Sequence, residues 1–444
     1  EWDLTDLYPA PDAPELASDL AWLKDECTAF AADYEGKLDS LDGDGFAACI
    51  ARYERLSQVI GRIMSYAGLR YYQNTTDPDR AKTFSDLQAQ ITDISTPTVF
   101  FSLELNRLSQ DRIEAFLSGP AARYRPWMER VRSMAPHQLS DELEKFLHDQ
   151  SVVGSAAWNR LFDETMAGLT FEVEGETLPL EATLNLLTDT DRAKREAGAK
   201  ALAAVFTDRL PLFTRITNTL AKEKEIEDRW RKFDTPQASR HLSNHVEPEV
   251  VEALRTAVTE AYPRLSHRYY ALKAKWLGLE TLEIWDRNAP LDDDPTLVPW
   301  DEAKTTVLDA YAAFDPAMAE IAQPFFERGW IDAAVTPGKA PGAFAHPTVT
   351  DAHPYVLLNY LGKTRDVMTL AHELGHGVHQ VLAAGQGELL SSTPLTLAET
   401  ASVFGEMLTF RKLLDACEDP ARSKILLAGK VEDMINTVVR QIAF

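Results

Sequence analysis

The five residues His372-Glu-Leu-Gly-His376 carry the most information in the chain. On a helix, side chains four residues apart lie one turn above each other on the same face. Two neutral imidazoles at that spacing can both ligate one Zn²⁺, and Glu373 between them can take a proton from a water at the metal. The pattern therefore predicts a metal site with its own base, provided that this segment is helical.

The residues around the motif predict such a helix. Thr364 is a plausible N-cap, Asp366 falls in the first turn, and Gly385 and Gly387 end the segment. Apolar residues recur between these ends at helical spacing: Val367, Leu370, Ala371, Leu374, Val378 and Leu382. Gly375 costs about 1 kcal/mol relative to Ala inside a helix, so we expect another backbone to approach closely there.

A third ligand must come from outside this helix. Leu382 occupies the position where some zinc peptidases have a third histidine, which leaves the glutamates that follow. Glu388 lies in a predicted loop, which positions a ligand poorly. A further helix is expected to begin at Thr393-Pro394, and Glu399 lies inside it among apolar residues. A carboxylate there must be paired, hydrogen-bonded or metal-bound, so Glu399 is the predicted ligand.

Three more side chains are candidates for a supporting shell around the metal. Glu406 lies two turns beyond Glu399 and is predicted to be a second-shell partner or a simple ion pair. His379 shares the helix face of His376, where it either hydrogen-bonds near the site or only packs. Asp366 could orient a histidine, since zinc-bound imidazoles donate their other N–H to carboxylates, although a charge at the helix start is the commoner role.

Several stretches resemble the oligoendopeptidase F branch of the thimet oligopeptidase family of zinc metallopeptidases. The opening from Glu1 to Pro9 and the segment from Tyr269 to Leu279 resemble that branch. The most specific block runs from Pro354-Tyr-Val-Leu-Leu-Asn-Tyr360 through the motif to Glu399-Thr-Ala-Ser-Val-Phe-Gly-Glu406. The resemblance implies one zinc ion held by His372, His376 and Glu399, with Glu373 as general base.

The resemblance also implies a fold and a substrate. We expect a mainly α, multi-helical, two-lobed zincin-type metallopeptidase with a small β-sheet beside the active-site helix and a deep groove for short peptides. Residues 1–180 are the expected N-terminal helical domain, and residues 181–444 the expected zinc peptidase domain. Gly342, Ala343 and Phe344 resemble the family's strand that receives the substrate backbone, as in β-strand addition.

The family continues past the last residue of this chain. Its C-terminal part carries a histidine and tyrosines that steady the developing oxyanion, whereas this chain stops at Phe444 and does not begin with Met. We therefore expect it to be part of a longer chain, with the peptidase domain incomplete. Loss of one oxyanion donor typically lowers the rate by about 10²–10³.

Composition excludes several classes of function. The chain has 444 residues, 45% hydrophobic and 26% charged, as in ordinary globular proteins. Its net charge of −24 argues against binding to nucleic acid or to anionic membranes. Cys27, Cys49 and Cys417 are odd in number and far apart, so they are expected to be reduced. The chain shows no segment of transmembrane length and no signal peptide, and the expected location is cytoplasmic.

Most of the remaining chain is predicted to be helical. Helices are expected to open at Thr76-Asp-Pro-Asp79, ending near Pro97, at Ser140, and across Asp191 to Asp234. A hairpin is expected from Leu169 to Leu180 with its turn near Gly175, a loop from Ala289 to Pro299, and strand borders between Pro337 and Pro347.

Three functions remain open on the sequence alone. The leading hypothesis is a zinc endopeptidase that cleaves short oligopeptides. The alternatives are a non-catalytic peptide binder, either an inactive family member or a fragment, and a different zinc hydrolase such as a carboxypeptidase. The intact Glu373 argues against a pure binder, which has no use for a base. His346 and His353, upstream of the motif, either line the cleft or are structural. The oligomeric state is not indicated.

Overall fold

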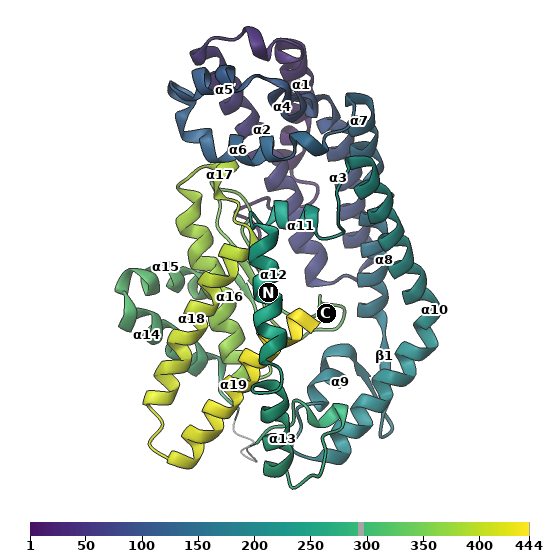
Figure 1. The fold of residues 1–444 in the computed structure, drawn as a ribbon, viewed down its shortest axis with the longest axis vertical. Coiled ribbons are helices and arrows are strands. Elements are labelled where there is room, and N and C mark those ends of the chain that lie inside the picture. Colours follow the sequence, from purple (N-terminus) through teal and green to yellow (C-terminus); the bar gives the residue numbers. More distant parts are fainter. Residues whose placement is uncertain (292–296, 444) are drawn as a thin grey trace.

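The computed structural model describes residues 1–291 and 297–443, and their fold is mainly α-helical with two small sheets, as predicted (Figure 1). The α-helices are α1 (Pro14–Tyr34), α2 (Gly43–Gln73), α3 (Pro78–Ser95), α4 (Phe100–Arg107), α5 (Gln110–Leu117), α6 (Arg125–Ser133), α7 (Asp141–Gln150), α8 (Ser155–Gly168), α9 (Leu180–Leu186), α10 (Arg192–Arg231), α11 (Ala238–Ser243), α12 (Pro248–Ala261), α13 (Ser266–Trp276), α14 (Trp300–Phe314), α15 (Pro316–Glu327), α16 (Thr364–Ala384), α17 (Glu388–Ser391), α18 (Leu395–Asp415) and α19 (Pro420–Ala443). The 3-10 helices are η1 (Leu38–Ser40), η2 (Thr96–Thr98), η3 (Pro120–Tyr124), η4 (Ala135–His137) and η5 (Ile284–Asp286). The strands are β1 (Thr170–Val173), β2 (Glu176–Pro179), β3 (Ile331–Asp332), β4 (Phe344–His346) and β5 (Tyr355–Leu357).

The predicted helix boundaries in the first half of the chain are confirmed. Asp77 caps α3 by accepting hydrogen bonds from the backbone of Asp79 and Arg80, and α3 gives way to η2, which contains Pro97. Helix α7 follows Ser140, and α10 follows Asp191, whose side chain accepts a bond from the backbone N–H of Ala193. Capping side chains therefore satisfy exposed backbone donors at the starts of α3 and α10, whereas the Ser140 side chain makes no such bond at the start of α7.

The predicted hairpin is also confirmed. Strands β1 and β2 pair antiparallel, and the two residues between them, Glu174 and Gly175, have φ of 52° and 90°. Two residues of positive φ suit a tight hairpin turn, which Gly175 adopts without steric cost. Phe171 of this hairpin packs in a small apolar cluster with Leu202 of α10. The loop predicted from Ala289 to Pro299 contains residues 292–296, which lie outside the described residues.

One hydrophobic core joins the N-terminal helices to the second sheet and to the helix that carries the motif. Ile63 of α2, Val356 of β5 and Leu370 of α16 are all fully buried members of this core. Figure 1 shows α16 and α18 side by side, with α10 on the opposite side of the molecule. The division of the chain at residue 180, and its description as two lobes, stay predictions.

The second sheet has the order β3-β5-β4 and lies beside α16. Strand β5 is central and buried, pairing parallel with β3 and antiparallel with β4. Strand β4 is therefore an edge strand. On its free side the backbone carbonyl of Ala345 accepts a hydrogen bond from Gln380 of α16 at 3.2 Å. The sheet edge is thus held directly against the helix of the motif.

Helix α16, which carries the motif, begins at Thr364, so the predicted N-cap residue is instead the first residue of the helix. The N-cap position is Lys363. The Asp366 carboxylate accepts hydrogen bonds from the backbone N–H groups of Leu361 and Lys363, at 2.8 and 3.0 Å, and so fixes the chain before the helix. Asp366 therefore serves the helix start, the commoner of its two predicted roles.

The close approach expected at Gly375 is confirmed. A Cβ at this position would lie 2.9 Å from both the carbonyl oxygen of Ala401 and the Cα of Ser402, on α18. Only a glycine allows the two helix backbones to come this close. The contact brings the middle of α18 against the turn of α16 that carries both histidines.

Two sequence predictions on the α16–α18 connection were wrong in detail. Glu388 lies in the short helix α17 and not in a loop, and its carboxylate accepts bonds from the backbone N–H and hydroxyl of Thr350. Helix α18 has Pro394 at its N-cap position and begins at Leu395, one residue later than expected.

The three cysteines are free, as predicted.

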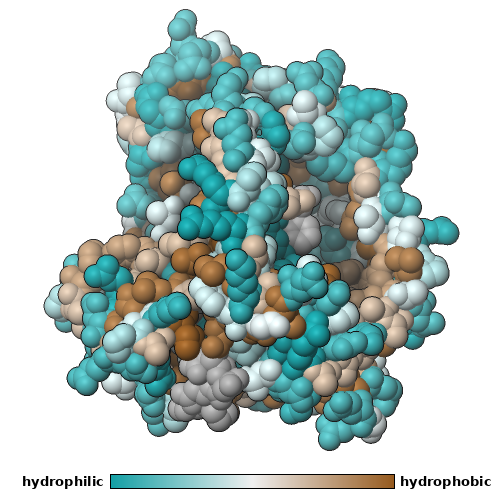
Figure 2. Space-filling view, turned by 60° about the horizontal axis from the view of Figure 1, so that its bottom comes forward, coloured by the Kyte–Doolittle hydropathy of each residue, from teal (hydrophilic) through white to brown (hydrophobic). Residues whose placement is uncertain are grey.

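The surface mixes charged and apolar areas, and Figure 2 shows apolar residues gathered in the lower half of the face turned forward. Exposed apolar side chains on α19 include Leu427, Val431, Met434 and Val438. Within the described residues, no helix has both the length and the apolar character needed to cross a bilayer.

Candidate metal centre

The two histidines of the motif lie on one face of α16, and Glu399 of α18 reaches toward both. The His372 and His376 rings are 5.0 Å apart between centroids and nearly perpendicular, at 83°. The distance from His372 Nε2 to Glu399 Oε2 is 3.4 Å, and that from His376 Nε2 to Glu399 Oε1 is 3.7 Å. One potential ligand atom from each of the three residues lies within 4.8 Å of the others.

These separations fit a zinc ion. Tetrahedral zinc with bonds of about 2.0–2.2 Å keeps its ligand atoms roughly 3.3–3.6 Å apart. The two imidazole–carboxylate separations, 3.4 and 3.7 Å, are close to that spacing, and the three ligand atoms all lie within 4.8 Å of one another. Two imidazoles and one carboxylate also form a ligand set typical of catalytic zinc, which leaves a fourth position open.

Glu399 is more exposed than the sequence predicted, because half of its side chain is exposed. The apolar neighbours Leu395 and Leu397 are themselves exposed, so this face of α18 borders an open cleft rather than a core. The hydrogen bond with His372 holds the pKa of Glu399 below its usual value, and Ser402 Oγ donates a further bond at 3.2 Å. Glu399 is therefore ionised and available to a cation.

Glu373 lies beside the three candidate ligands and is only 7% exposed. Burial raises the pKa of its carboxyl to about 7, and the charge of Glu399 adds to the rise. His372 and a hydrogen bond with the backbone of Ala345 act in the opposite direction. A carboxyl with its pKa near neutrality can both accept and return a proton.

The far side of His372 contacts a second carboxylate, Glu406, whose role as a second-shell partner or a simple ion pair stays a prediction. His372 Nδ1 lies 3.3 Å from Glu406 Oε2. Burial opposes a charge on His372, but hydrogen bonds with Glu399 and Glu406 raise the pKa of the ring to about 10. These carboxylates therefore favour a positive charge at His372, which a proton or a metal ion can supply.

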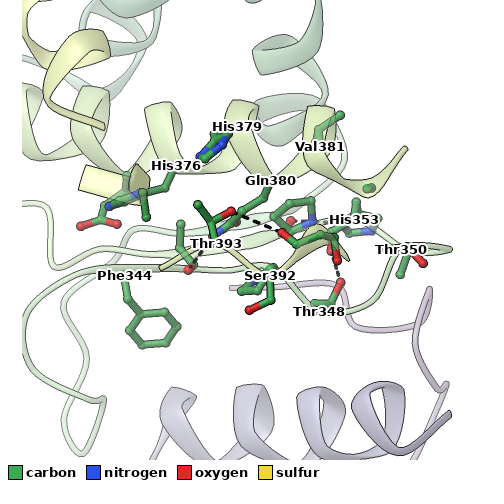
Figure 3. Close-up of a pocket in the computed structure, with 18 of the residues that line it drawn as sticks. Phe344, Thr348, Thr350, His353, His376, His379, Gln380, Val381, Ser392 and Thr393 are labelled. Carbon is green, nitrogen blue, oxygen red and sulfur yellow. Dashed lines mark hydrogen bonds between the residues drawn. The ribbon is translucent and has the colours of Figure 1, made fainter. Parts of the chain in front are cut away.

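Other predicted site residues line the same cleft, but their side chains do not all point toward α16. His379 lines the cleft one turn beyond His376 (Figure 3), and its supporting role stays a prediction. Ala343 and Phe344 also line the cleft, whereas the ring of Phe344 points away from α16 and packs against Trp2 and Tyr72, at centroid distances of 6.2 and 5.3 Å.

His346 and His353 both have structural partners. His346 is half-buried, its Nε2 lies 3.0 Å from Ser65 Oγ, and burial of the ring lowers its pKa to about 4. His353 stacks on Trp330 at 3.6 Å between centroids, and its Nε2 lies 2.9 Å from Asp6 Oδ2. His353 also lines the cleft, so both of its predicted roles apply.

The cleft has a volume of about 1090 Å³. It runs from the three candidate ligands along α16 to the segments that carry Thr348, Thr350, Ser392 and Thr393, which lie below this helix in Figure 3. Pockets for single small molecules are typically about 300–1,000 Å³. This cleft is therefore large enough for a ligand of several residues.

Three residues near the site were not predicted from the sequence. Ser402 bonds Glu399 from three residues further along α18, a spacing that could have revealed it. The buried Tyr311 donates from its hydroxyl to the carbonyl of Ala371 at 2.6 Å, and Lys430 of α19 binds Glu406. Neither of these two has a local signal in the sequence, because they come from distant helices.

Comparison with known proteins identifies the family. The profile described as Peptidase family M3 matches residues 185–444, more than half of the chain, and that described as Oligopeptidase F matches residues 104–171. Oligopeptidase PepF of Bacillus subtilis is 26% identical over 100% of this chain and 67% of its own length. Group B oligopeptidase PepB of Streptococcus agalactiae is also 26% identical, over 100% of this chain and 74% of its own.

Solved structures share the fold. Oligoendopeptidase-F from Enterococcus faecium superposes with a TM-score of 0.67 at 23% identity, covering 96% of this chain and 71% of its own. A structure of PZ peptidase A with an inhibitor superposes with a TM-score of 0.77 at 14% identity, covering 93% and 73%. The family resemblance predicted from the sequence is thereby confirmed. The chain belongs to peptidase family M3 and is a metalloendopeptidase.

Proposed function

We propose that the protein is a zinc-dependent endopeptidase that hydrolyses internal bonds of short oligopeptides, with Glu373 as general base. The observation that carries the proposal is the convergence of His372, His376 and Glu399 beside Glu373 in the wall of one cleft. The names of the relatives, oligopeptidase PepF and oligopeptidase PepB, support short peptides as substrates. A cytoplasmic location, and the expectation of no nucleic-acid or membrane partner, remain predictions from the sequence.

The metal would be held by the two Nε2 atoms and the Glu399 carboxylate. Bound zinc would supply a Lewis acid that polarises the peptide carbonyl and makes water a better nucleophile near neutral pH. Glu373 accepts the proton of the attacking water and passes it to the nitrogen of the leaving amine. Its burial, with 7% of the residue exposed, keeps the carboxyl away from bulk solvent during this transfer.

The peptide is proposed to pair with the backbone at Ala343, which lies one residue before β4 and lines the cleft. At Ala345 the outer edge of β4 is already bonded to Gln380 and Glu373 of α16, so the peptide is proposed to use this edge only before the strand begins. An extended peptide can pair with such an edge through its backbone and needs no particular side chain there. This mode of binding suits an enzyme that accepts varied oligopeptides.

Glu373→Gln tests the proposal. The amide keeps the shape of the side chain but cannot accept the proton, so cleavage of an internally quenched peptide with blocked ends should fall by about 10²–10⁴. Zinc content should be unchanged. The control is Glu320→Gln, which changes an exposed glutamate on α15 and should keep wild-type cleavage. Near-normal turnover by the Glu373 variant would reject the assignment, and failure to cut a peptide with blocked ends would favour a carboxypeptidase.

A further inference from the structure

We propose that Lys430, on α19, is a positioning residue for the metal centre: it holds the Glu406 carboxylate in the orientation that binds the His372 ring. This inference rests on the proposed function, because it concerns the zinc affinity of the same site. It assigns a role in metal binding to a helix that contributes no ligand of its own.

The contacts form a continuous line from α19 to the candidate ligands. Lys430 Nζ donates to Glu406 Oε1 and to Asp433 Oδ2, the latter at 3.1 Å. The other oxygen of the same carboxylate, Glu406 Oε2, lies 3.3 Å from His372 Nδ1. The opposite nitrogen of that ring, Nε2, faces Glu399. The Glu406 carboxylate thus contacts Lys430 through one oxygen and His372 through the other.

The side chains of Lys430 and Glu406 are largely buried, so the Glu406 carboxylate needs the lysine as a charged partner. The side chains of Lys430 and Glu406 are 9% and 11% exposed. A carboxylate so far from water needs a cation to offset the cost of its burial. Without Lys430, we expect the Glu406 carboxylate to turn toward solvent and to leave Nδ1 of His372.

The position of Glu406 matters because it decides which nitrogen of His372 is free. A carboxylate at Nδ1 keeps the proton on that nitrogen and directs the lone pair of Nε2 toward the metal. Loss of such a partner typically weakens metal binding by about 10–100-fold. A simple ion pair between α18 and α19 would affect stability and leave zinc affinity unchanged, so the two roles can be separated.

The first experiment measures the zinc dissociation constant of Lys430→Met by competition with a chromogenic chelator. We expect binding about tenfold weaker than in the wild type. The matched control is Lys273→Met, because Lys273 is also buried and pairs with Glu432 of α19 away from the metal centre. This control should lower the unfolding temperature and keep the zinc affinity. Equal zinc affinity in wild type and Lys430→Met would overturn the proposal.

A second comparison, which does not depend on the folding of Lys430→Met, tests whether Lys430 acts through Glu406. Glu406→Gln and the double variant Glu406→Gln/Lys430→Met both remove the buried carboxylate, so neither leaves it unpaired. If Lys430 acts through Glu406, the two should bind zinc within about twofold of each other. A further tenfold loss in the double variant would contradict the proposal. A wild type that binds no zinc would instead reject the proposed function itself, which keeps the two failures distinct.

Discussion

At the residue scale, Glu373 combines burial with a place beside the candidate metal ligands. Burial disfavours its charged form, and the Glu399 carboxylate disfavours it further, so its pKa rises to about 7 in the metal-free protein. A bound cation would act in the opposite direction. The working pKa should therefore lie between the ordinary value of 4.5 and about 7.

This range predicts the acid side of the pH profile. Below the pKa of Glu373 the carboxyl holds a proton and cannot accept another, so kcat/KM should fall about tenfold per pH unit as the pH decreases. The measurement is kcat/KM from pH 4 to 8 at saturating zinc, with zinc occupancy determined at each pH. A flat profile over this range at constant occupancy would contradict the role of Glu373.

The metal-free state of His372 gives a second prediction at this scale. With its pKa raised to about 10 by Glu399 and Glu406, the ring carries a proton at pH 7.5 that a metal must displace. Zinc binding should release about one proton from this ring, measurable by titration calorimetry in buffers of different ionisation enthalpy. His372→Ala should abolish that release together with zinc binding, and a wild-type titration without proton release would contradict the assignment.

At the scale of elements, the contact between α16 and α18 depends on Gly375. A methyl group there would meet the backbone of Ala401 and Ser402 at 2.9 Å and push the helices apart. Gly375→Ala should cost roughly 1–3 kcal/mol of folding free energy, as overpacking does. It should also weaken zinc binding, because Glu399 lies on the displaced helix.

The matched control for this variant is Gly429→Ala. Gly429 is exposed on α19, and a Cβ added there meets nothing within 4 Å. This substitution should leave zinc affinity unchanged and stabilise the helix by up to about 1 kcal/mol. Urea unfolding and zinc titration of both variants test the pair of predictions, and equal stability of the two would contradict the close packing at Gly375.

The elements that the sequence predicted well are those with local signals. The helix around His372 follows from apolar spacing and from Asp366, and the hairpin follows from its alternation and Gly175. Glu399 was placed on the correct helix, but its exposure was missed because the apolar residues near it line a cleft. Lys430 and Tyr311 could not be predicted, since only folding brings α19 and α14 to this site.

At the scale of the whole molecule, the candidate ligands come from two helices, α16 and α18, that differ in how far their apolar residues are buried. Helix α16 lies in the main hydrophobic core, whereas α18 contributes largely exposed apolar residues around Glu399. A metal that bridges them should therefore stabilise the fold. Zinc at 1,000 times its dissociation constant would add about 4 kcal/mol to the free energy of unfolding.

Removal of the metal should then lower the unfolding temperature by several degrees. Differential scanning calorimetry with and without a chelator measures the difference, and restored zinc should reverse it. The control is the His376→Ala variant, whose unfolding temperature should not respond to the chelator. An identical unfolding temperature for wild type with and without metal would mean that zinc does not link α16 to α18.

The central claim is that His372, His376 and Glu399 hold one zinc ion. The most direct measurement is anomalous diffraction from crystals of the zinc-loaded protein, collected on both sides of the zinc absorption edge. The account predicts one strong peak, about 2.0–2.2 Å from both Nε2 atoms and from a carboxylate oxygen of Glu399. A peak elsewhere, or none beside these three residues, would contradict it.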